Sequence, residues 1–216
     1  MSAVPVDLYC ERLGPELLAE PVNVATNATF FLVAWELWRF ARRRNALSGD
    51  IRLLIALIFA IGIGSSLFHT FAVTWTHWLD LVPILMFQLA FLWAYMRRPI
   101  GLRPAPTAAL VAAFLAVALY GRQFPHLLNG SLTYAPALFV MLALGLYHWR
   151  RQKPRRLALL AATGVLAAAL VFRTIDAAIC ERFPYGTHFL WHLLIPVALY
   201  LCVLALLASP TAPDAR

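Results

Sequence analysis

The sequence predicts an all-α integral membrane protein, built as a bundle of seven transmembrane helices. Of its 216 residues, 62% are hydrophobic and only 13% are charged, and the mean hydropathy is +0.74. This composition is typical of chains that lie mostly in lipid. The apolar stretches are much longer than the roughly 10 residues of a membrane β-strand, which favours helices. These stretches use most of the chain, so no separate soluble domain is expected.

Seven stretches approach the roughly 20 residues that a helix needs to cross about 30 Å of hydrocarbon. Each of the first six ends at a short polar break with glycine, proline or charged residues, as turns require. In chain order they are 23–40, before ARRRN; 51–72, before VTWT; 78–96, before RRPIGLR; 107–120, before GRQFPHLLNG; 132–149, before RRQKPRR; 157–179, before CERFPYG; and 187–207. We expect one domain over 1–216, with an outer N-terminal segment (1–21), a membrane bundle (22–207) and a cytoplasmic tail (208–216).

Basic residues predict the orientation of the bundle. The breaks after the first, third and fifth stretches are rich in arginine, whereas the other three carry little positive charge. Short loops rich in Lys and Arg stay cytoplasmic, so the N-terminus is expected outside and the C-terminus inside. Contact with anionic lipid headgroups explains the net charge of +8. Its division among separate loops argues against a nucleic-acid partner.

Five polar side chains fall at one membrane depth in this topology. The second stretch runs outward and brings Ser65 and His69, which share one helical face, close to the outer surface. The third and seventh stretches begin at that surface. They place Asp80 near the start of one, and His188 and His192 in the first two turns of the other. Ionisable groups inside a membrane are costly, so this shared depth indicates a functional site.

Three histidines favour zinc over harder cations. Neutral imidazole is a preferred zinc ligand, and the face shared by His188 and His192 can direct both rings at one ion. Three nitrogen ligands with an open fourth position are typical of catalytic zinc, whereas calcium and magnesium prefer oxygen. Taken singly, each residue is better explained as a hydrogen-bonded residue of the membrane interface. Only their combination indicates a metal site.

The same residues carry a resemblance to a known family. The order SxxxH, then an aspartate eleven residues later, then HxxxH in the last stretch resembles the alkaline ceramidases, within a superfamily of seven-span membrane hydrolases that includes the adiponectin receptors. GIGSSLFHTF with WLDLVPI, FRTIDAAIC and HFLWHLL resemble the family's second and third, sixth and seventh spans. YCE followed by AEPVNVATNATFF resembles its N-terminal segment and first span. The resemblance covers nearly the whole chain.

The resemblance implies a zinc-dependent intramembrane amidase that cleaves ceramide, or a ceramide-like lipid, into a sphingoid base and a fatty acid. Carried onto this chain, His69, His188 and His192 would hold the zinc, which acidifies water and polarises the carbonyl. Asp80 would orient the attacking water, accept its proton and pass it to the leaving amine. Ser65 would hydrogen-bond the water or the oxyanion. A direct fourth-ligand role for Asp80 stays open.

The resemblance also makes a disulfide between Cys10 and Cys180 the favoured pairing. The topology places Cys10 before the first span and Cys180 after the sixth, so both are expected on the outer, oxidising side. Two unpaired thiols are the alternative, since the sequence does not give the distance between them. Cys202 lies deep in the last span, where a packed thiol is expected.

The family's calcium site is matched only in part. The resemblance would give calcium the carboxylates of Glu11 and Glu20. However, the acidic position before YCE is Leu8, and the asparagine position after it is Leu13. Calcium takes six to eight oxygen ligands, so this set is thin and regulation by calcium is in doubt.

Asp176 has two interpretations. It lies three residues after Arg173, and the two side chains can form a structural ion pair on one helix. The resemblance favours instead a carboxylate that accepts the ring N–H of a zinc-binding histidine and fixes its tautomer.

Two other function classes fit the same pattern. A receptor or signalling protein on this scaffold would hold zinc structurally, and a transporter would use the embedded histidines and aspartate as a proton relay. Clustering of the polar groups at one face argues against a transporter, although Gln88 lies deeper. The expected partner is a membrane lipid, ceramide or another N-acyl lipid. The expected location is a bacterial inner membrane, with the site toward the periplasmic face.

Overall fold

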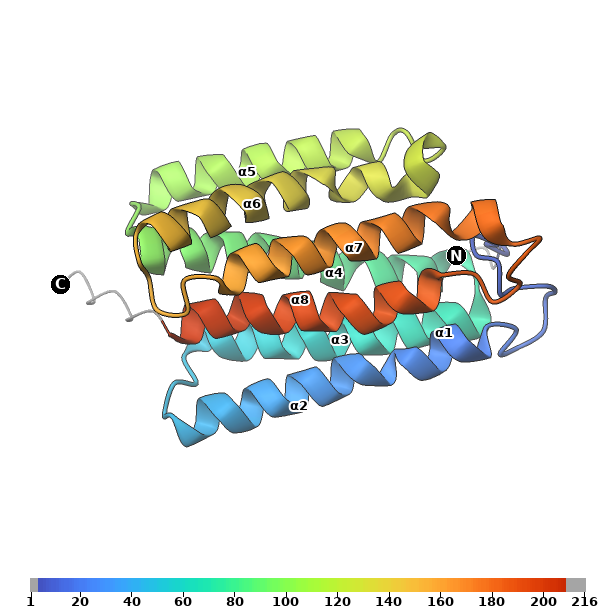
Figure 1. Ribbon diagram of the computed structural model, residues 1–216, viewed down its shortest axis with the longest axis horizontal. Helices are drawn as coiled ribbons and strands as arrows, with labels where there is room; N and C mark the ends of the chain where they lie inside the picture. The colour runs from blue at the N-terminus through green and yellow to red at the C-terminus, as the bar shows by residue number, and fades with distance from the viewer. Residues whose placement is uncertain (1–3, 209–216) are drawn as a thin grey trace.

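Long helices lying side by side form the framework of the computed structural model, which describes residues 4–208 (Figure 1). Within these residues, ten helical elements follow one another. They are α1 (Pro21–Thr26), α2 (Ala28–Arg43), α3 (Gly49–Phe71), α4 (Thr74–Tyr95), η1 (Met96–Ile100), α5 (Pro104–Gly121), η2 (Leu127–Tyr134), α6 (Ala135–Arg150), α7 (Ala158–Ile179) and α8 (His188–Leu207). The predicted tail at 208–216 lies, apart from its first residue, outside the described residues.

Six helical segments of the described chain are long and apolar enough to cross a membrane. They correspond to the second to seventh predicted stretches, with boundaries that differ by a few residues. α4 continues into η1, and η2 leads into α6. Six such helices indicate a multi-pass membrane protein.

The prediction of a further span over 23–40 is not confirmed. This part of the chain forms two helices, α1 and α2, with Asn27 between them. The Asn27 amide donates a hydrogen bond to the backbone carbonyl of Asn23, 3.0 Å away. Such side-chain bonds compete with the helical backbone pattern. α2 has only 16 residues and carries charged side chains such as Glu36 and Arg39.

α3 and α8 form the centre of the bundle. α3 packs against α2 and α4, while α8 packs against α7, α2 and α3. Over their most apolar 18 residues, 56% of positions are buried, against 22% in α5. The buried face of α3 includes Leu54, Ile58 and Ile61 at helical spacing. Large exposed apolar side chains such as Phe59 and Phe139 cover outward faces, as lipid contact requires.

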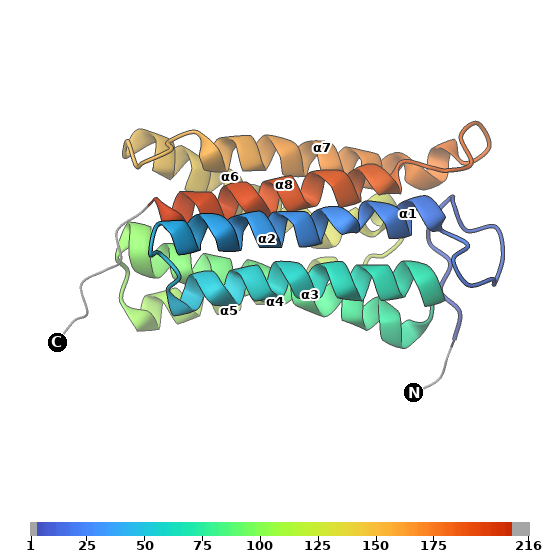
Figure 2. The same ribbon diagram turned by 90° about the horizontal axis from the view of Figure 1, so that it is seen from below.

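The helix connections alternate between the two ends of the bundle. The α2–α3, α4–α5 and α6–α7 connections, with the three arginine-rich clusters, lie at one end (Figures 1 and 2). The N-terminal segment and the α3–α4, α5–α6 and α7–α8 connections lie at the other end. The basic clusters are therefore separated by the length of the bundle from the start of α8 and the end of α3.

The N-terminal segment is fastened to the second of these ends. The Val6 N–H donates to the Ala72 carbonyl, 2.8 Å away, just after α3 ends. A disulfide joins Cys10 to Cys180, which follows α7, with the Cα atoms 5.1 Å apart. The predicted disulfide is thus confirmed, and Cys202 is a buried free thiol as expected.

Candidate metal centre

Three histidines meet at the end of the bundle that the N-terminal segment covers. His69 lies in the last turn of α3, His188 begins α8, and His192 follows one turn later. One nitrogen from each ring lies within 4.8 Å of the other two. All three residues are at most 2% exposed. Imidazole nitrogens at this spacing can bind one metal ion.

Hydrogen bonds determine which ring nitrogen is free in two of these histidines. The Nδ1–H of His192 donates to the Asn23 carbonyl, 3.0 Å away, and the Nδ1–H of His69 donates to the Glu20 carboxylate. A neutral ring that donates through one nitrogen offers a lone pair on the other. Nε2 of His69 is indeed buried without a hydrogen-bond partner among residues 4–208, and so is Nδ1 of His188.

A metal ion fits these rings because it would satisfy nitrogens that the protein leaves unpaired. A buried polar atom without a partner destabilises the fold by about 1–3 kcal/mol. The orphaned nitrogens point to a ligand at the cluster, and a set of three imidazoles is typical of zinc.

Asp80 and Ser65 meet beside the histidines, as the sequence predicts. Ser65 precedes His69 by one turn of α3, and Asp80 lies in the second turn of α4. The Asp80 carboxylate interacts with the Ser65 side chain and, electrostatically, with His69. The structure therefore brings together all five polar side chains that the topology placed at one depth.

Gly64 allows α3 and α4 to approach closely at this point. A Cβ on Gly64 would overlap the backbone carbonyl of Leu79 and crowd the Asp80 amide nitrogen. Backbone atoms cannot swing aside as a flexible side chain can, so a residue without Cβ is required. Ser65 follows Gly64 and Asp80 follows Leu79, so this close approach brings the hydroxyl to the carboxylate.

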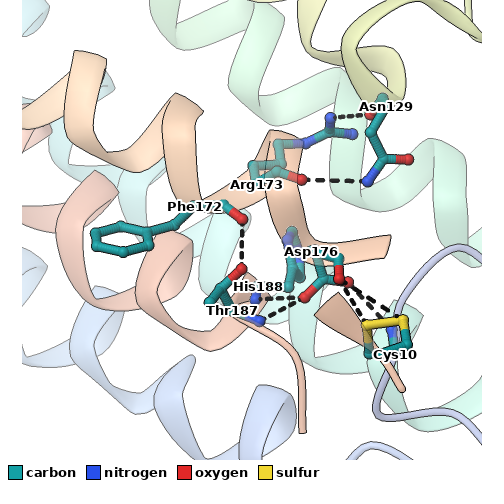
Figure 3. Close-up of a disulfide and its surroundings, with 8 residues drawn as sticks. Cys10, Asn129, Phe172, Arg173, Asp176, Thr187 and His188 are labelled. Carbon is teal, nitrogen blue, oxygen red and sulfur yellow. Dashed lines mark hydrogen bonds between the residues drawn. A yellow bond between two sulfur atoms is a disulfide. The ribbon is translucent and has the colours of Figure 1, made fainter. Parts of the chain in front are cut away.

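Asp176 builds the start of α8, and among residues 4–208 its carboxylate makes no hydrogen bond to a histidine ring. Its Oδ1 accepts the backbone N–H groups of Thr187 and His188, at 2.6 and 2.9 Å. Its Oδ2 accepts the backbone N–H of Cys10 at 3.1 Å (Figure 3). The expectation that Asp176 accepts a ring N–H is therefore corrected. It positions His188 through the backbone, by capping the first turn of its helix.

Arg173 lies beside Asp176 in sequence but binds elsewhere. Its guanidinium donates to the Asn129 carbonyl at 2.6 Å (Figure 3). It also donates to Ser131 Oγ at 3.1 Å, and it interacts electrostatically with the side chain of Tyr9. Across residues 4–208 no ion pair joins Arg173 to Asp176, so the alternative interpretation of a helical ion pair is not observed. Arg173 instead holds η2 against α7.

Tyr9 covers the histidine cluster, and no role in the site was predicted for it from the sequence. Its ring stacks on His188, with centroids 3.5 Å apart and planes 13° apart. Burial raises the pKa of the Tyr9 phenol above its ordinary value. The disulfide of the adjacent Cys10 holds the tyrosine in place. Its position in YCE, beside a bridging cysteine, was the only available signal.

Glu11, one of the two candidate calcium ligands, caps the start of α1. Its Oε1 accepts the Val22 N–H at 2.6 Å, and its Oε2 accepts the Asn23 N–H at 2.9 Å. Burial raises the pKa of this carboxyl although both backbone bonds lower it. Both oxygens are therefore engaged by the backbone.

Glu20, the other candidate, is bound by cationic and polar side chains. Its Oε1 accepts Arg12 Nε at 2.7 Å, and its Oε2 accepts the Asn23 amide at 3.1 Å as well as His69 Nδ1. Burial alone would raise the pKa of Glu20, but the hydrogen bonds and charges of His69 and Arg12 hold it below its usual range.

The residues present do not fit a calcium ion. Both carboxylates are already engaged, and the positions that resemble the remaining ligands are Leu8 and Leu13. Their apolar side chains are exposed and carry no oxygen. The two carboxylates that the family resemblance assigns to calcium have other roles: Glu11 caps α1, and Glu20 binds His69. Reasoning from sequence missed this role of Glu20, together with Arg12 and Asn23.

The family model of the ceramidases matches residues 9–212, nearly the whole chain. The chain belongs to the ceramidase family. A search of curated proteins finds no match. Family membership implies a hydrolase that acts on an amide bond and takes a lipid substrate. The histidine cluster, Asp80 and the covering Tyr9 all fall within the matched residues.

Two cavities adjoin the centre of this ceramidase-family protein. An apolar cavity of about 70 Å³ lies among the helices, and its lining includes Ile61, Phe87, Phe114, Tyr134, Trp191 and Cys202. A more polar cavity of about 190 Å³ lies at the end that carries the histidines, and its lining includes Tyr9, His77, Arg122, Asn129, Tyr134 and Arg173. Tyr134 lines both cavities, so both adjoin this residue.

Proposed function

We propose that this ceramidase-family protein is a zinc-dependent amidase that hydrolyses the N-acyl bond of ceramide or a ceramide-like lipid. The observation that carries the proposal is the convergence of buried, unpaired histidine nitrogens beside Asp80 in a ceramidase-family bundle. His69, His188 and His192 would hold the zinc ion. Zinc bound there would supply Lewis-acid polarisation of the carbonyl and acidify a water molecule.

Asp80 is the residue suited to move protons. As the water oxygen attacks the amide carbon, the Asp80 carboxylate accepts the proton of the water. As the C–N bond breaks, Asp80 returns that proton to the leaving nitrogen, which releases a fatty acid and an amine. The Ser65 hydroxyl would orient the carboxylate with which it interacts, and Tyr9 would shield the histidines from bulk water.

The two cavities match the two parts of an N-acyl lipid. The acyl chain would lie in the apolar cavity, where burial of methylene groups provides the binding energy. The polar headgroup would lie in the cavity lined by Arg122, Asn129 and Arg173. The amide between them would then lie near the ring of Tyr134, at the end of the bundle that carries the histidines.

We further propose that this end of the bundle faces away from the cytoplasm. The support is the position of the three arginine-rich connections at the opposite end (Figure 1), since such loops stay cytoplasmic. A cysteine introduced at the exposed position His126 should react with an impermeant thiol reagent on intact cells. A cysteine at Arg155, exposed at the other end, should not react. The reverse pattern would overturn the orientation.

The test of the activity is fatty-acid release by the purified protein from a panel of N-acyl lipids. We expect release that stops when the metal is stripped by a chelator and returns with added zinc. The variant His126→Ala, at an exposed position outside the cluster, is the control and should keep full activity. Release that persists after verified metal removal would contradict the zinc mechanism. A correctly folded, zinc-loaded protein that releases no fatty acid from any lipid would contradict the amidase.

A further inference from the structure

The guanidinium of Arg12 lies in a cage of oxygen atoms beneath the N-terminal segment. Its Nε donates to Glu20 Oε1 at 2.7 Å. Its Nη1 faces the backbone carbonyls of Gly14 and Glu16, at 3.3 and 3.4 Å. Its Nη2 donates to the His69 carbonyl at 3.1 Å. The residue is only 8% exposed, so one buried cation is surrounded by one carboxylate and three carbonyl oxygens.

This donor set is the kind that a hard metal cation takes in proteins. Calcium binds carboxylate and backbone carbonyl oxygens, and both kinds surround the guanidinium. The His69 carbonyl belongs to the last turn of α3, where backbone carbonyls lack helical partners and the helix dipole attracts positive charge. A guanidinium stays charged at any physiological pH, so it supplies a permanent cation there.

We propose that Arg12 is a built-in cation that replaces calcium in the N-terminal segment. Its charge neutralises Glu20, and its N–H groups bind the three backbone carbonyls that a bound ion would otherwise bind. The N-terminal segment is therefore ordered without calcium. Arg12 also contacts His69, because it donates to the His69 carbonyl directly and pairs with the Glu20 carboxylate that accepts from Nδ1. The proposal concerns the N-terminal segment and holds for any lipid substrate.

The charge of Arg12 leaves no place for a calcium ion beside it. A second cation within the cage would be repelled by the guanidinium at close range in a poorly solvated site. The nearby carboxylate of Glu11 is engaged by backbone N–H groups. Removing the guanidinium should therefore expose a latent cation site made of Glu20 and the three carbonyls.

The experiment is a calcium titration of the full-length, zinc-loaded protein in detergent, read by calorimetry and by thermal denaturation. The wild type should show no saturable calcium binding up to about 10 mM, above the affinity range of weak extracellular sites. Arg12→Ala should melt at a lower temperature than wild type. Calcium at about ten times its dissociation constant should then raise the melting temperature of this variant by about 4 °C.

Three controls identify the site. Magnesium should stabilise Arg12→Ala less than calcium, because magnesium demands tighter octahedral geometry. The double variant Arg12→Ala/Glu20→Gln should lose the calcium response. Arg39→Ala removes an exposed arginine that pairs with Glu36 and should show no calcium response at all.

Two outcomes would overturn the proposal. One is stoichiometric calcium binding to the wild type with a rise in its melting temperature, a result that does not depend on any variant. The other is a folded Arg12→Ala that calcium does not stabilise. If Arg12→Ala does not fold, Arg12→Gln takes its place, and the wild-type titration still decides whether the segment binds calcium.

Discussion

Replacing Glu20 with glutamine should weaken zinc binding without removing a ligand. Oε1 of Glu20 accepts from Arg12, while Oε2 accepts from Asn23 and from His69 Nδ1. Glutamine has the same shape but only one oxygen. Its NH₂ group must therefore face either the guanidinium of Arg12 or the N–H groups of His69 and Asn23, and one set of donors is left unpaired.

Two effects of different size are expected from Glu20→Gln. The outer partner of a metal-binding histidine contributes about 10–100-fold to metal affinity, which is about 1.4–2.7 kcal/mol. The buried pair with Arg12, whose side chains are 6% and 2% exposed, is broken at a cost of about 3–5 kcal/mol. Glutamine keeps part of the hydrogen bonding, so we take about 3 kcal/mol. For a chain of this size that is a melting temperature about 6–12 °C lower.

The assay is a zinc competition titration against a chromophoric chelator, combined with thermal denaturation of the same samples. Glu11→Gln is the matched control, because Glu11 is also buried but binds only backbone N–H groups of α1. It should lower the melting temperature while leaving zinc affinity within about twofold of wild type, since it touches no ligand histidine. Equal zinc affinities for Glu20→Gln and wild type would refute the role assigned to Glu20.

Three further predictions concern the centre and its surroundings. His192→Ala should lower zinc affinity by more than the roughly 100-fold expected for a supporting residue. The variant should lose turnover but keep a circular dichroism spectrum close to that of wild type. Zinc bound with unchanged affinity would contradict the role of His192 as a ligand. Gly64→Ala should force α4 away at Leu79 and destabilise the fold by about 1–3 kcal/mol. The displacement of Asp80 should lower kcat by about 100-fold. An unchanged kcat would show that the close approach of the two helices is not needed. Ala198→Phe should fill the apolar cavity and raise KM for long-chain substrates more than for short-chain ones, whereas an equal effect on both would place the acyl chain elsewhere.

The helical framework and the common depth of the candidate metal-binding residues could be predicted from the sequence, because both depend on local properties of the chain. Apolar length determines which segments can cross lipid, and arginine-rich loops mark alternate ends. Once six helices alternate in direction, the depth of Ser65, His69 and Asp80 follows from their positions along their own helices. A span over the first stretch, 23–40, stays a prediction, because this part of the chain forms two helices, α1 and α2, with Asn27 between them.

The roles of the supporting residues were decided by the tertiary structure. The sequence offered Glu11, Glu20 and Asp176 as acidic residues near the site, but a carboxylate binds whichever donor the fold brings to it. Glu20 meets Arg12 and His69, and Asp176 meets the amides that begin α8.

The sequence by itself therefore determined a helical membrane bundle with three histidines, an aspartate and a serine at one depth, because hydrophobicity and helical spacing can be read along the chain. The likeness to the ceramidases came separately, from the resemblance of its motifs. Only the tertiary structure decided that Glu20 binds both His69 and Arg12, and that Tyr9 covers His188. These assignments depend on contacts between segments far apart in sequence, where direction and distance select each hydrogen-bond partner.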